Sequence, residues 1–432
     1  MPINHVITTL QTLFKDKKIG IWGLGKTGQS IVACIAPYAK NIYIMESADL
    51  TDAQKECIKK HNAQLVPAEY VPQFLEVCEV IIPSPGINIE PYKEKYPTLF
   101  MSELDIFGAC IQTPIIAITG SVGKTTTTHL LEQILNKLGK RTKAVGNIGT
   151  PMLSVIHDQQ LYDYFIVEVS SFQLEHIQSF APTIATILNI APNHLDRHIT
   201  MENYLRAKGQ LLAHQTDAQY AILPMTFTDE FWPFVQQQKV HWVGSDAYDY
   251  IMEALSDVTC KENLIIILAI LEQLGFEPEA LITFVKELSR PAHRMEFVRT
   301  FNGIDFYNDS KATVQESTLQ ALEQCKDKPT ILLLGGLSKG VSRQPLIQQL
   351  PKTLKHVICF GAEAEQLHRW CMEEVLASTS HATLEQACAQ ALSIAEPGDI
   401  VLFSPAGTSY DLFKNFEERG NRFKELVHQI TK

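Results

Sequence analysis

The sequence lacks the features that mark secreted and membrane proteins. Its nine cysteines are scattered singly with no C-x-x-C pair, which indicates reduced thiols and not a disulfide framework. The longest fully apolar run, Leu264–Leu271, is far shorter than the roughly 20 residues that span a bilayer. Residues 1–8 show no basic stretch before an apolar core, so we expect no secretory signal. We therefore predict a cytoplasmic protein without membrane insertion.

Basic residues are also in short supply. The chain has 37 Lys and Arg against 48 Asp and Glu, which gives a net charge of -11. A nucleic-acid-binding protein normally carries a basic face, so we expect no nucleic-acid partner. Anionic small molecules stay possible, because a few cations can serve one pocket. Hydrophobic residues make up 45% of the chain and charged residues 20%, which is typical of a globular protein. The length of 432 residues is enough for two or three domains.

Short β-rich runs alternate with helical patterns along the chain, which predicts an α/β fold with parallel sheets covered by helices. The alternation restarts near Pro114 and again after Pro291, so we predict three domains, 1–107, 108–290 and 291–432. The expected strands are Lys18–Trp22, Asn41–Met45, Val80–Ile82, Ile115–Thr119, Phe165–Val169, Thr183–Ile190, Ile304–Asn308, Thr330–Leu334, His356–Phe360 and Ile400–Phe403. The expected helices include Thr125–Leu138, Met201–Ala213 and Glu262–Leu274, with a further helical stretch to about Ser289.

The first glycine-rich turn, Gly23–Gly28, follows a strand and opens a helix, and Glu46 stands at the end of the next strand. This is the form of a dinucleotide fingerprint, in which glycines permit a tight turn and let phosphate oxygens approach the helix N-terminus. An acidic residue at that distance can accept hydrogen bonds from a ribose or a base. The pattern leaves NAD binding and a plain strand-to-helix turn both open, and NAD would leave the rest of the sequence unexplained.

The second turn, Gly120-Ser121-Val122-Gly123-Lys124-Thr125-Thr126, is more specific because it lies between an apolar strand and an amphipathic helix. Successive backbone N–H groups of such a turn can cradle a polyphosphate. Lys124 would reach the β- and γ-phosphates, and the Thr125 hydroxyl would coordinate Mg²⁺. The strict phosphate-loop pattern needs glycine at position 118, where this chain has Ile118, so we interpret the turn as a shortened phosphate loop.

Polar residues follow several other expected strands and could complete a metal and transfer site. Glu168 ends a strand of the second domain and His194 follows the next one, so both could face the bound nucleotide. Taken alone, the position of Lys208 in its helical pattern is typical of an ordinary surface lysine. The third domain has polar clusters at strand ends, as ligand sites of α/β domains do, at Ala292–Arg294, Asn308–Thr313, Ser338–Lys339 and Ser404–Ser409.

Together these motifs resemble the Mur ligases, the ATP-dependent amino-acid ligases of peptidoglycan precursor synthesis. The most specific parts are Ile166–Glu175, Asn308–Thr313 and Ser404–Gly420. Within the last of these, Phe413–Gly420 is similar to the tail of the members that add D-glutamate. The resemblance implies a Rossmann-like N-terminal domain that binds a UDP substrate, a P-loop-type central ATPase domain and a Rossmann-like C-terminal domain that admits the amino acid.

Residue by residue, the resemblance also implies roles for positions that match the family's motifs. The positions that match the UDP-substrate site are Thr27, Glu46, Ser47, Ser84, Pro85, Gly86 and Asn147. The positions that match the ATP site are Gly120, Ser121, Gly123, Lys124, Thr125, Thr126, Asn263, Arg294 and Asp309. The matching magnesium ligands are Thr125, Glu168, His194 and Lys208, and the matching D-glutamate residues are Thr313, Lys339, Ser409 and Phe416.

The activity that the resemblance implies is phosphoryl transfer followed by amide formation, with ATP and Mg²⁺ as cofactors. The carboxylate of UDP-N-acetylmuramoyl-L-alanine would attack the γ-phosphate, and the amine of D-glutamate would then displace phosphate from the acyl phosphate. Lys124, His194 and Lys208 match catalytic positions, and Lys208 matches a lysine that family members carbamylate. A buried lysine can take up CO₂ in this way because its pKa shifts readily. We expect the enzyme to be a monomer.

Several positions depart from the family's common pattern. Val122 stands where the phosphate loop usually has a polar residue, Asn193 replaces an acid before the metal-binding histidine, and Val314 replaces a frequent asparagine. Thr259-Cys260 occupies the place of a His-Asn pair, and residues 214–258 look abbreviated. These differences leave two alternatives open. One is a nucleotide-binding relative that has lost ligase activity, and the other is a ligase of the same fold with a different acceptor.

Overall fold

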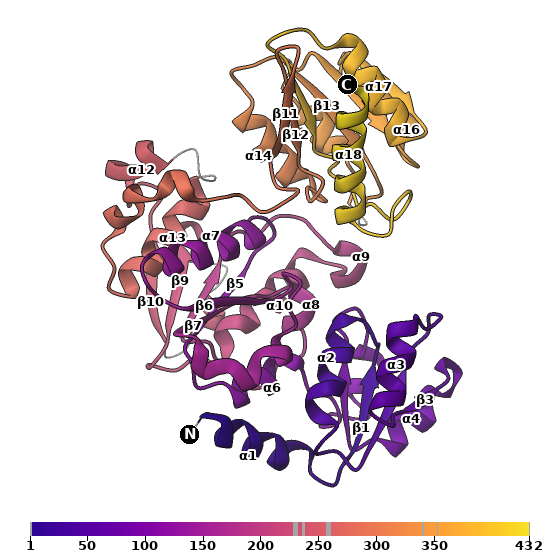
Figure 1. The fold of residues 1–432 in the computed structure, drawn as a ribbon, viewed down its shortest axis with the longest axis vertical. Coiled ribbons are helices and arrows are strands. Elements are labelled where there is room, and N and C mark those ends of the chain that lie inside the picture. The colour runs from indigo at the N-terminus through magenta and orange to yellow at the C-terminus, as the bar shows by residue number, and fades with distance from the viewer. Residues whose placement is uncertain are drawn as a thin grey trace. The chain divides into compact units, whose positions relative to one another are not determined.

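The computed structural model describes residues 2–227, 232–235, 238–255, 261–338, 341–351 and 353–431. The described residues form two compact units. Figure 1 shows and labels helices and strands of both. Unit 1 comprises Met1–Asn189, Leu205–Leu255 and Lys261–Lys286, and unit 2 comprises Ile190–Tyr204 and Glu287–Lys432. The two units contain three sheets flanked by helices, and this confirms the predicted α/β class.

The first part of unit 1 holds a four-stranded parallel sheet in the order β3-β2-β1-β4. Its strands are β1 (Lys18–Trp22), β2 (Asn41–Met45), β3 (Gln64–Val66) and β4 (Val80–Pro83). The helices of this segment are α1 (Pro2–Phe14), α2 (Lys26–Ile35), α3 (Asp52–Lys60), η1 (Ala68–Tyr70), α4 (Val71–Val77) and α5 (Glu90–Lys93). Because the strands are parallel, β1, β2 and β4 all end at the edge from which the first glycine turn emerges.

The second sheet of unit 1 has six parallel strands in the order β10-β9-β8-β5-β7-β6. Its strands are β5 (Ile115–Thr119), β6 (Thr142–Gly146), β7 (Tyr164–Glu168), β8 (Ile184–Ile187), β9 (Tyr220–Pro224) and β10 (Lys239–Val243). The helices are α6 (Glu103–Cys110), α7 (Lys124–Lys137), η2 (Met152–Leu161), α8 (Ser171–Leu174), α10 (Met201–Ala213), η3 (Met225–Phe227), η4 (Trp232–Phe234), α12 (Asp249–Leu255), α13 (Lys261–Gln273), η5 (Pro278–Thr283) and η6 (Val285–Glu287). Every residue of β5 is buried, as expected for an inner strand of a sheet covered on both faces.

Helix α7 carries the second glycine turn at its N-terminus, and its sequence explains both of its ends. It begins after Gly123, whose left-handed backbone redirects the chain. Leu130, Leu131 and Ile134 are buried on one face, which packs toward the sheet and α13. After the C-cap, Gly139 takes a φ of +80°, the conformation that commonly ends a helix.

Unit 2 is built on a six-stranded sheet in the order β11-β12-β16-β13-β14-β15, in which β11 pairs antiparallel with β12 and the other pairs are parallel. Its strands are β11 (Glu296–Phe301), β12 (Ile304–Asn308), β13 (Thr330–Gly335), β14 (His356–Phe360), β15 (Ser378–His381) and β16 (Ile400–Phe403). Its helices are α9 (Leu195–His198), α14 (Gln315–Gln324), α15 (Gln344–Gln349), α16 (Ala364–Glu373), α17 (Leu384–Ile394) and α18 (Phe416–Ile430).

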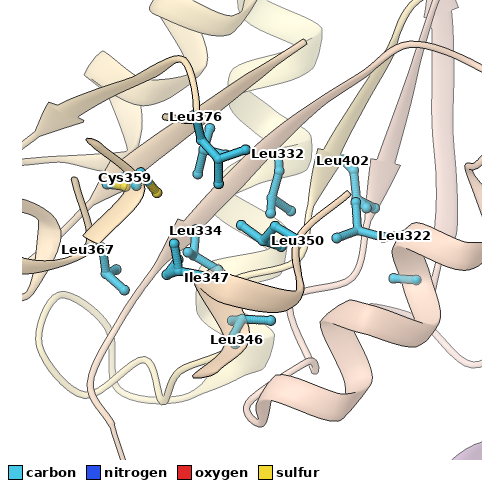
Figure 2. Close-up of a cluster of buried hydrophobic side chains, with 14 of the residues drawn as sticks. Leu322, Leu332, Leu334, Leu346, Ile347, Leu350, Cys359, Leu367, Leu376 and Leu402 are labelled. Atoms are coloured by element: carbon cyan, nitrogen blue, oxygen red, sulfur yellow. The ribbon is translucent and has the colours of Figure 1, made fainter. Parts of the chain in front are cut away.

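The core of unit 2 lies on both faces of this sheet. Alternate residues of β13 point to opposite sides, so Leu332 and Leu334 join one cluster while Ile331 and Leu333 join the other. Helices α14, α15 and α16 contribute to the first cluster, which Figure 2 shows with Leu346, Ile347 and Leu367 gathered around β13. Helices α17 and α18 contribute to the second cluster. Helices therefore cover both faces of a mostly parallel sheet.

The structure differs from the sequence-based expectations mainly at sheet edges and strand ends. The strand expected at Thr183–Ile190 is too long, since β8 covers only Ile184–Ile187, and the helix expected up to Ser289 consists of the short 3-10 turns η5 and η6. The sequence reasoning missed β3, β6, β9, β10, β11 and β15. Edge strands such as β3 and β15 contain no fully buried residue, so they carry no apolar run to detect. Among the described helices, none is both long and apolar enough to cross a membrane.

Candidate functional site

The second glycine turn joins β5 to α7 at the carboxyl edge of the six-stranded sheet of unit 1. Gly123 has a φ of +86°, and a Cβ there would lie 2.5 Å from Oδ1 of Asn263 on α13. Gly120 has a φ of +153°, and a Cβ there would lie 3.0 Å from Cβ of Leu188. Both positions therefore need glycine. The turn leads directly into the N-terminus of α7, where backbone N–H groups and the helix dipole favour an anion.

Two lysines donate to the same carbonyl oxygen of this turn. Nζ of Lys124 donates to the Gly120 carbonyl at 2.6 Å and to the Ser121 carbonyl at 3.1 Å. Nζ of Lys208, on α10, donates to the Gly120 carbonyl at 2.9 Å and to Oγ1 of Thr119 at 3.3 Å. The two amines thus lie close together at the N-terminus of α7.

Lys208 is a buried residue, with 1% of its surface exposed. The helical pattern taken alone indicated a surface lysine, and that interpretation is wrong. Burial lowers the pKa of Lys208 well below its ordinary value; the positive charge of Lys124 lowers it further, whereas Glu168 acts in the opposite direction. The tertiary contacts of α10 thus place an easily deprotonated amine beside the turn.

Glu168 ends β7 and is 1% exposed. Its Oε1 accepts a hydrogen bond from Nδ2 of Asn147 at 2.9 Å, whereas Oε2 is buried and has no hydrogen-bond partner among the residues that the structure describes. A buried carboxylate oxygen in this state fits a divalent cation. The described residues include no group of three or more His, Cys, Asp or Glu side chains arranged to hold a metal. A cation at Glu168 would therefore need hydroxyl, water or phosphate oxygens as further ligands, as Mg²⁺ usually has.

The first glycine turn is closed by two side chains from neighbouring strand ends. Glu46, after β2, accepts hydrogen bonds from the backbone N–H groups of Leu24, Ser47 and Ala48 at 2.8, 2.8 and 3.2 Å. Ser84, after β4, donates from Oγ to the Gly23 carbonyl at 3.1 Å. A Cβ on Gly23, whose φ is +96°, would lie 2.6 Å from Oγ of Ser84.

In unit 2, Asp309 follows β12 and is fully buried. Its Oδ1 accepts from the backbone N–H of Met295 at 3.2 Å and its Oδ2 accepts from Oγ of Ser404 at 2.8 Å. Burial raises the pKa of Asp309 to about 6, although the nearby charge of Arg294 and these hydrogen bonds lower it.

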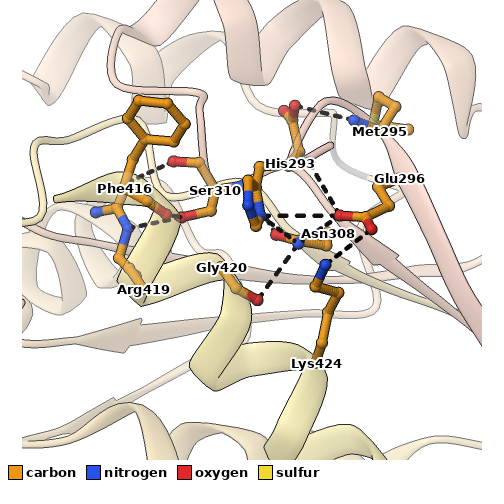
Figure 3. Close-up of polar contacts among 10 residues, drawn as sticks. His293, Met295, Glu296, Asn308, Ser310, Phe416, Arg419, Gly420 and Lys424 are labelled. Atoms are coloured by element: carbon orange, nitrogen blue, oxygen red, sulfur yellow. Dashed lines mark hydrogen bonds and ion pairs between the residues drawn. The ribbon is translucent and has the colours of Figure 1, made fainter. Parts of the chain in front are cut away.

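Arg419, on α18, is completely buried and connects the loops that follow β12 and β16. Its guanidinium donates to Oγ and the carbonyl of Ser310 at 3.1 and 2.7 Å, and to the carbonyls of Gly407 and Thr408 at 3.0 and 3.1 Å. Ser310 in turn donates from Oγ to the Phe416 carbonyl at 2.9 Å, as Figure 3 shows. The start of α18 is thereby tied to two strand-end loops.

A second polar group, also drawn in Figure 3, is centred on Asn308. Its Nδ2 lies 2.9 Å from Oε2 of Glu296 and 2.9 Å from Nδ1 of His293, and Lys424 pairs with the other carboxylate oxygen of Glu296 at 3.0 Å. A Cβ on Gly420 would lie 2.2 Å from Nδ1 of His293. Glycine at this helical position therefore allows α18 to pack against the residues that precede β11.

Two family models match this chain, and so do curated relatives of nearly the same length. The model described as the Mur ligase middle domain matches residues 118–261, and the model described as Mur ligase, glutamate ligase domain matches residues 293–407. A UDP-N-acetylmuramoylalanine--D-glutamate ligase of Caldanaerobacter subterraneus subsp. tengcongensis is 31% identical over 97% of this chain and 99% of the relative. A relative of the same name from Geotalea daltonii is 32% identical over 96% of this chain and 98% of its own length.

The chain belongs to the Mur ligase family. It is accordingly an ATP-dependent amide-forming ligase of peptidoglycan synthesis. Among solved structures, the MurF ligase of Thermotoga maritima in complex with ADP is similar, with a TM-score of 0.59 at 14% identity over 97% of both chains. At that identity the likeness shows the shared fold alone.

The residues predicted as sites in this Mur ligase fall into separate groups. Around the second glycine turn lie Ser121, Lys124, Thr125, Thr126, Asn147, Glu168, Lys208 and Asn263, and around the first glycine turn, also in unit 1, lie Thr27, Glu46, Ser47, Ser84, Pro85 and Gly86. Unit 2 contains His194, Arg294, Asp309, Thr313, Ser409 and Phe416. A small cavity of about 20 Å³ in unit 2 is lined in part by Asn193, Thr313 and Ser338. Lys339, Thr259 and Cys260 lie outside the described residues.

The sequence reasoning missed several side chains that shape these sites. Asn189 binds the backbone of the second glycine turn. Arg343 is 2% exposed, pairs with Glu363 and donates to the carbonyls of Gly335 and Gly336 at 2.8 and 2.9 Å. Arg419 lies within Phe413–Gly420, the stretch that is similar to the D-glutamate-adding members, but the sequence reasoning assigned it no role. An arginine or asparagine in a loop or helix gives no local signal of burial, because its partners come from distant segments.

Proposed function

We propose that this Mur ligase joins D-glutamate to UDP-N-acetylmuramoyl-L-alanine in the cytoplasm, with ATP converted to ADP and phosphate. The observation that carries the proposal is the pair formed by Lys124 and the buried Lys208 on the Gly120 carbonyl, at a glycine turn that opens a helix. The acceptor is supported by the D-glutamate ligases that match nearly the whole chain and by the tail Phe413–Gly420.

In this proposal each of the three predicted domains binds one substrate. Residues 1–107 would bind the UDP part of the substrate at the first glycine turn, with Thr27, Glu46, Ser47 and Ser84–Gly86 nearest to it. Residues 108–290 would bind ATP, and residues 291–432 would bind the amino acid. The Glu46 carboxylate already accepts three backbone N–H groups, so its position beside the turn is held without a ligand. Asn147 would contact the substrate while it orients Glu168.

The first chemical step is proposed at the second glycine turn. The substrate carboxylate attacks the γ-phosphorus of ATP, a new P–O bond forms, and ADP leaves with the electrons of the broken P–O bond. The backbone N–H groups at the start of α7 bind the phosphates, and Lys124 exchanges the Gly120 carbonyl for phosphate oxygens. Gly120, Ser121, Gly123, Thr125 and Thr126 shape this cradle, and Asn263 packs against Gly123 beside the nucleotide. Arg294 and Asp309 are proposed to complete the ATP site.

Thr125, Glu168, His194 and Lys208 are the residues that would hold Mg²⁺, and the buried oxygen of Glu168, to which no described residue donates a hydrogen bond, fits that role. Bound there, Mg²⁺ would neutralise charge on the phosphates. Lys208 would contribute as a carbamate: its neutral amine attacks CO₂, an N–C bond forms and one proton is released. The low pKa of Lys208 favours this, since only the neutral amine is a nucleophile. The carbamate is an anion, so a negative charge would then lie next to Lys124.

The second step forms the amide bond. The amine of D-glutamate attacks the carbonyl carbon of the acyl phosphate, the C–O bond to phosphate breaks, and the amine loses a proton. Thr313, Lys339, Ser409 and Phe416 are proposed to bind the amino acid, with Lys339 pairing with a substrate carboxylate. Arg419 holds the start of α18, from which Phe416 projects, and so fixes one wall of this site.

The test is an acceptor scan. Purified protein is given ATP, Mg²⁺, UDP-N-acetylmuramoyl-L-alanine and one amino acid at a time, and phosphate release and the product mass are measured. We expect release and the matching mass increase with D-glutamate, and neither with L-glutamate or without an amino acid. If only a different amino acid gives phosphate release, that amino acid and not D-glutamate is the acceptor. No release with any acceptor, despite nucleotide binding, would instead indicate a relative that has lost ligase activity.

A further inference from the structure

Asn189 lies directly against the second glycine turn. β8 ends at Ile187, and its pairing with β5 continues for one residue because the backbone N–H of Leu188 donates to the Thr119 carbonyl at 2.9 Å. The next residue, Asn189, is therefore delivered to the turn by the sheet itself. The backbone N–H of Ser121 donates to the Asn189 carbonyl at 3.0 Å.

The side chain of Asn189 makes two more hydrogen bonds, both to one residue of the turn. The backbone N–H of Val122 donates to Oδ1 of Asn189 at 2.8 Å, and Nδ2 of Asn189 donates to the Val122 carbonyl at 3.1 Å. Val122 is buried, so these two backbone groups would lose much of their hydration without a protein partner. A single carboxamide satisfies both because its acceptor and its donor are side by side.

This contact bears on the unusual residue at position 122. Where Mur ligases usually have a polar side chain in the loop, this chain has a valine, which can donate and accept only through its backbone. The side chain and carbonyl of Asn189 hold the N–H groups of Ser121 and Val122 on the sheet side. The N–H groups that follow, at the start of α7, are those that can serve a phosphate.

We propose that Asn189 is a positioning residue of the phosphate loop, which sets nucleotide affinity by holding Ser121 and Val122 in place without touching the nucleotide. The inference rests on the proposed binding of ATP at this turn. Loss of the side chain would let the turn adopt other conformations, and nucleotide binding would have to select the competent one. The apparent affinity for ADP would fall to its intrinsic value multiplied by the fraction of molecules that keep the competent turn. The sites for the UDP substrate and the amino acid would be unaffected.

The test measures ADP binding by calorimetry in the wild type, in Asn189→Ala and in a matched control, Asn136→Ala. Asn136 lies near the other end of α7, and its side chain also takes part in two hydrogen bonds, both accepted by Oδ1, from N–H and Oγ1 of Thr142 at 3.0 and 3.1 Å. We expect Asn189→Ala to raise the Kd for ADP at least about tenfold, and Asn136→Ala to change it less than about twofold, at similar losses of Tm. In the ligase reaction, KM for ATP should rise while KM for the other two substrates stays constant.

Two further measurements keep the inference testable if the alanine variant is unstable. Asn189→Gln keeps both the donor and the acceptor on a longer side chain. We expect its affinity for ADP to lie between those of the wild type and Asn189→Ala. Amide hydrogen exchange of the 120–124 peptide should be faster in either variant than in the wild type. An ADP Kd in Asn189→Gln and Asn189→Ala equal to that of the wild type would overturn the positioning role. If the wild type itself binds no nucleotide, the proposed function falls, and the inference falls with it.

Discussion

Nζ of Lys124 and Nζ of Lys208 donate to one carbonyl oxygen, that of Gly120, at 2.6 and 2.9 Å. Burial lowers the pKa of Lys208 well below its ordinary value, and repulsion by the positive charge of Lys124 at the same acceptor lowers it further. If ATP draws Lys124 toward its phosphates, this repulsion weakens. The ionisation of Lys208 is therefore expected to depend on nucleotide, a coupling that follows from the shared carbonyl.

The buried amine should reduce the stability of the protein without ligand. A lysine whose folded-state pKa is depressed binds its proton less tightly than the unfolded chain does, so stability rises with pH up to the ordinary value of 10.5. We expect Lys208→Met to be more stable than the wild type at pH 7, by on the order of 1 kcal/mol. The difference should shrink as the pH approaches 10.5. Urea unfolding at several pH values checks this, with Lys326→Met, an exposed site, expected to change little.

Activity should respond to Lys208 in the opposite direction. Lys208→Ala removes the group that would carry the carbamate, and we expect turnover to fall by at least about 100-fold, the size of effect typical of losing one group that stabilises the transition state. A short carboxylate such as acetate should restore part of the activity, because it can replace the carbamate anion in the space vacated. Turnover is measured with and without acetate in both proteins. Unchanged turnover in the variant would exclude a carbamate role.

Arg419 should be more important for stability than Arg422, the other arginine of α18. Arg419→Met leaves the buried acceptors of Ser310, Gly407 and Thr408 without their donor, which we expect to cost about 3 kcal/mol or more. Arg422, on the same helix, pairs with Glu385 and Glu425 at the surface, so Arg422→Met should cost less than about 1 kcal/mol. Urea unfolding of both variants makes the comparison, and equal losses would contradict the bridging role of Arg419.

Asp309 should make the stability of unit 2 depend on pH. Its folded-state pKa of about 6 lies above the ordinary value of 3.8, so the folded state holds the proton more tightly and stability falls as the pH rises from about 4 to about 6. A difference of about 2.2 between these values, at about 1.4 kcal/mol for each pKa unit, gives at most about 3 kcal/mol. Asp309→Asn should flatten this dependence, and the variant should be more stable than the wild type at pH 7. Denaturation curves between pH 4 and 7 measure it, and parallel pH profiles would refute the assignment.

The local sequence determined a large part of this protein. Glycines at strand-to-helix turns, buried apolar runs such as Ile115–Thr119 and the helix that follows Gly123 are short-range signals, and the structure bears them out. The family motifs extended this to the ligase class, and the Mur ligase models match residues 118–261, which include Lys124 and Glu168, and residues 293–407.

Only the tertiary structure decided the environments of the side chains. The helical pattern around Lys208 indicated a surface residue, but α10 packs so that its amine meets Gly120, 88 positions earlier in the chain. Asn189 reaches Val122 across 67 positions, and Arg419 reaches Ser310 across 109. Burial, pKa and hydrogen-bond partners are set by such distant contacts, and local propensity does not encode them. Sequence therefore located the turns, and packing determined which side chains complete them.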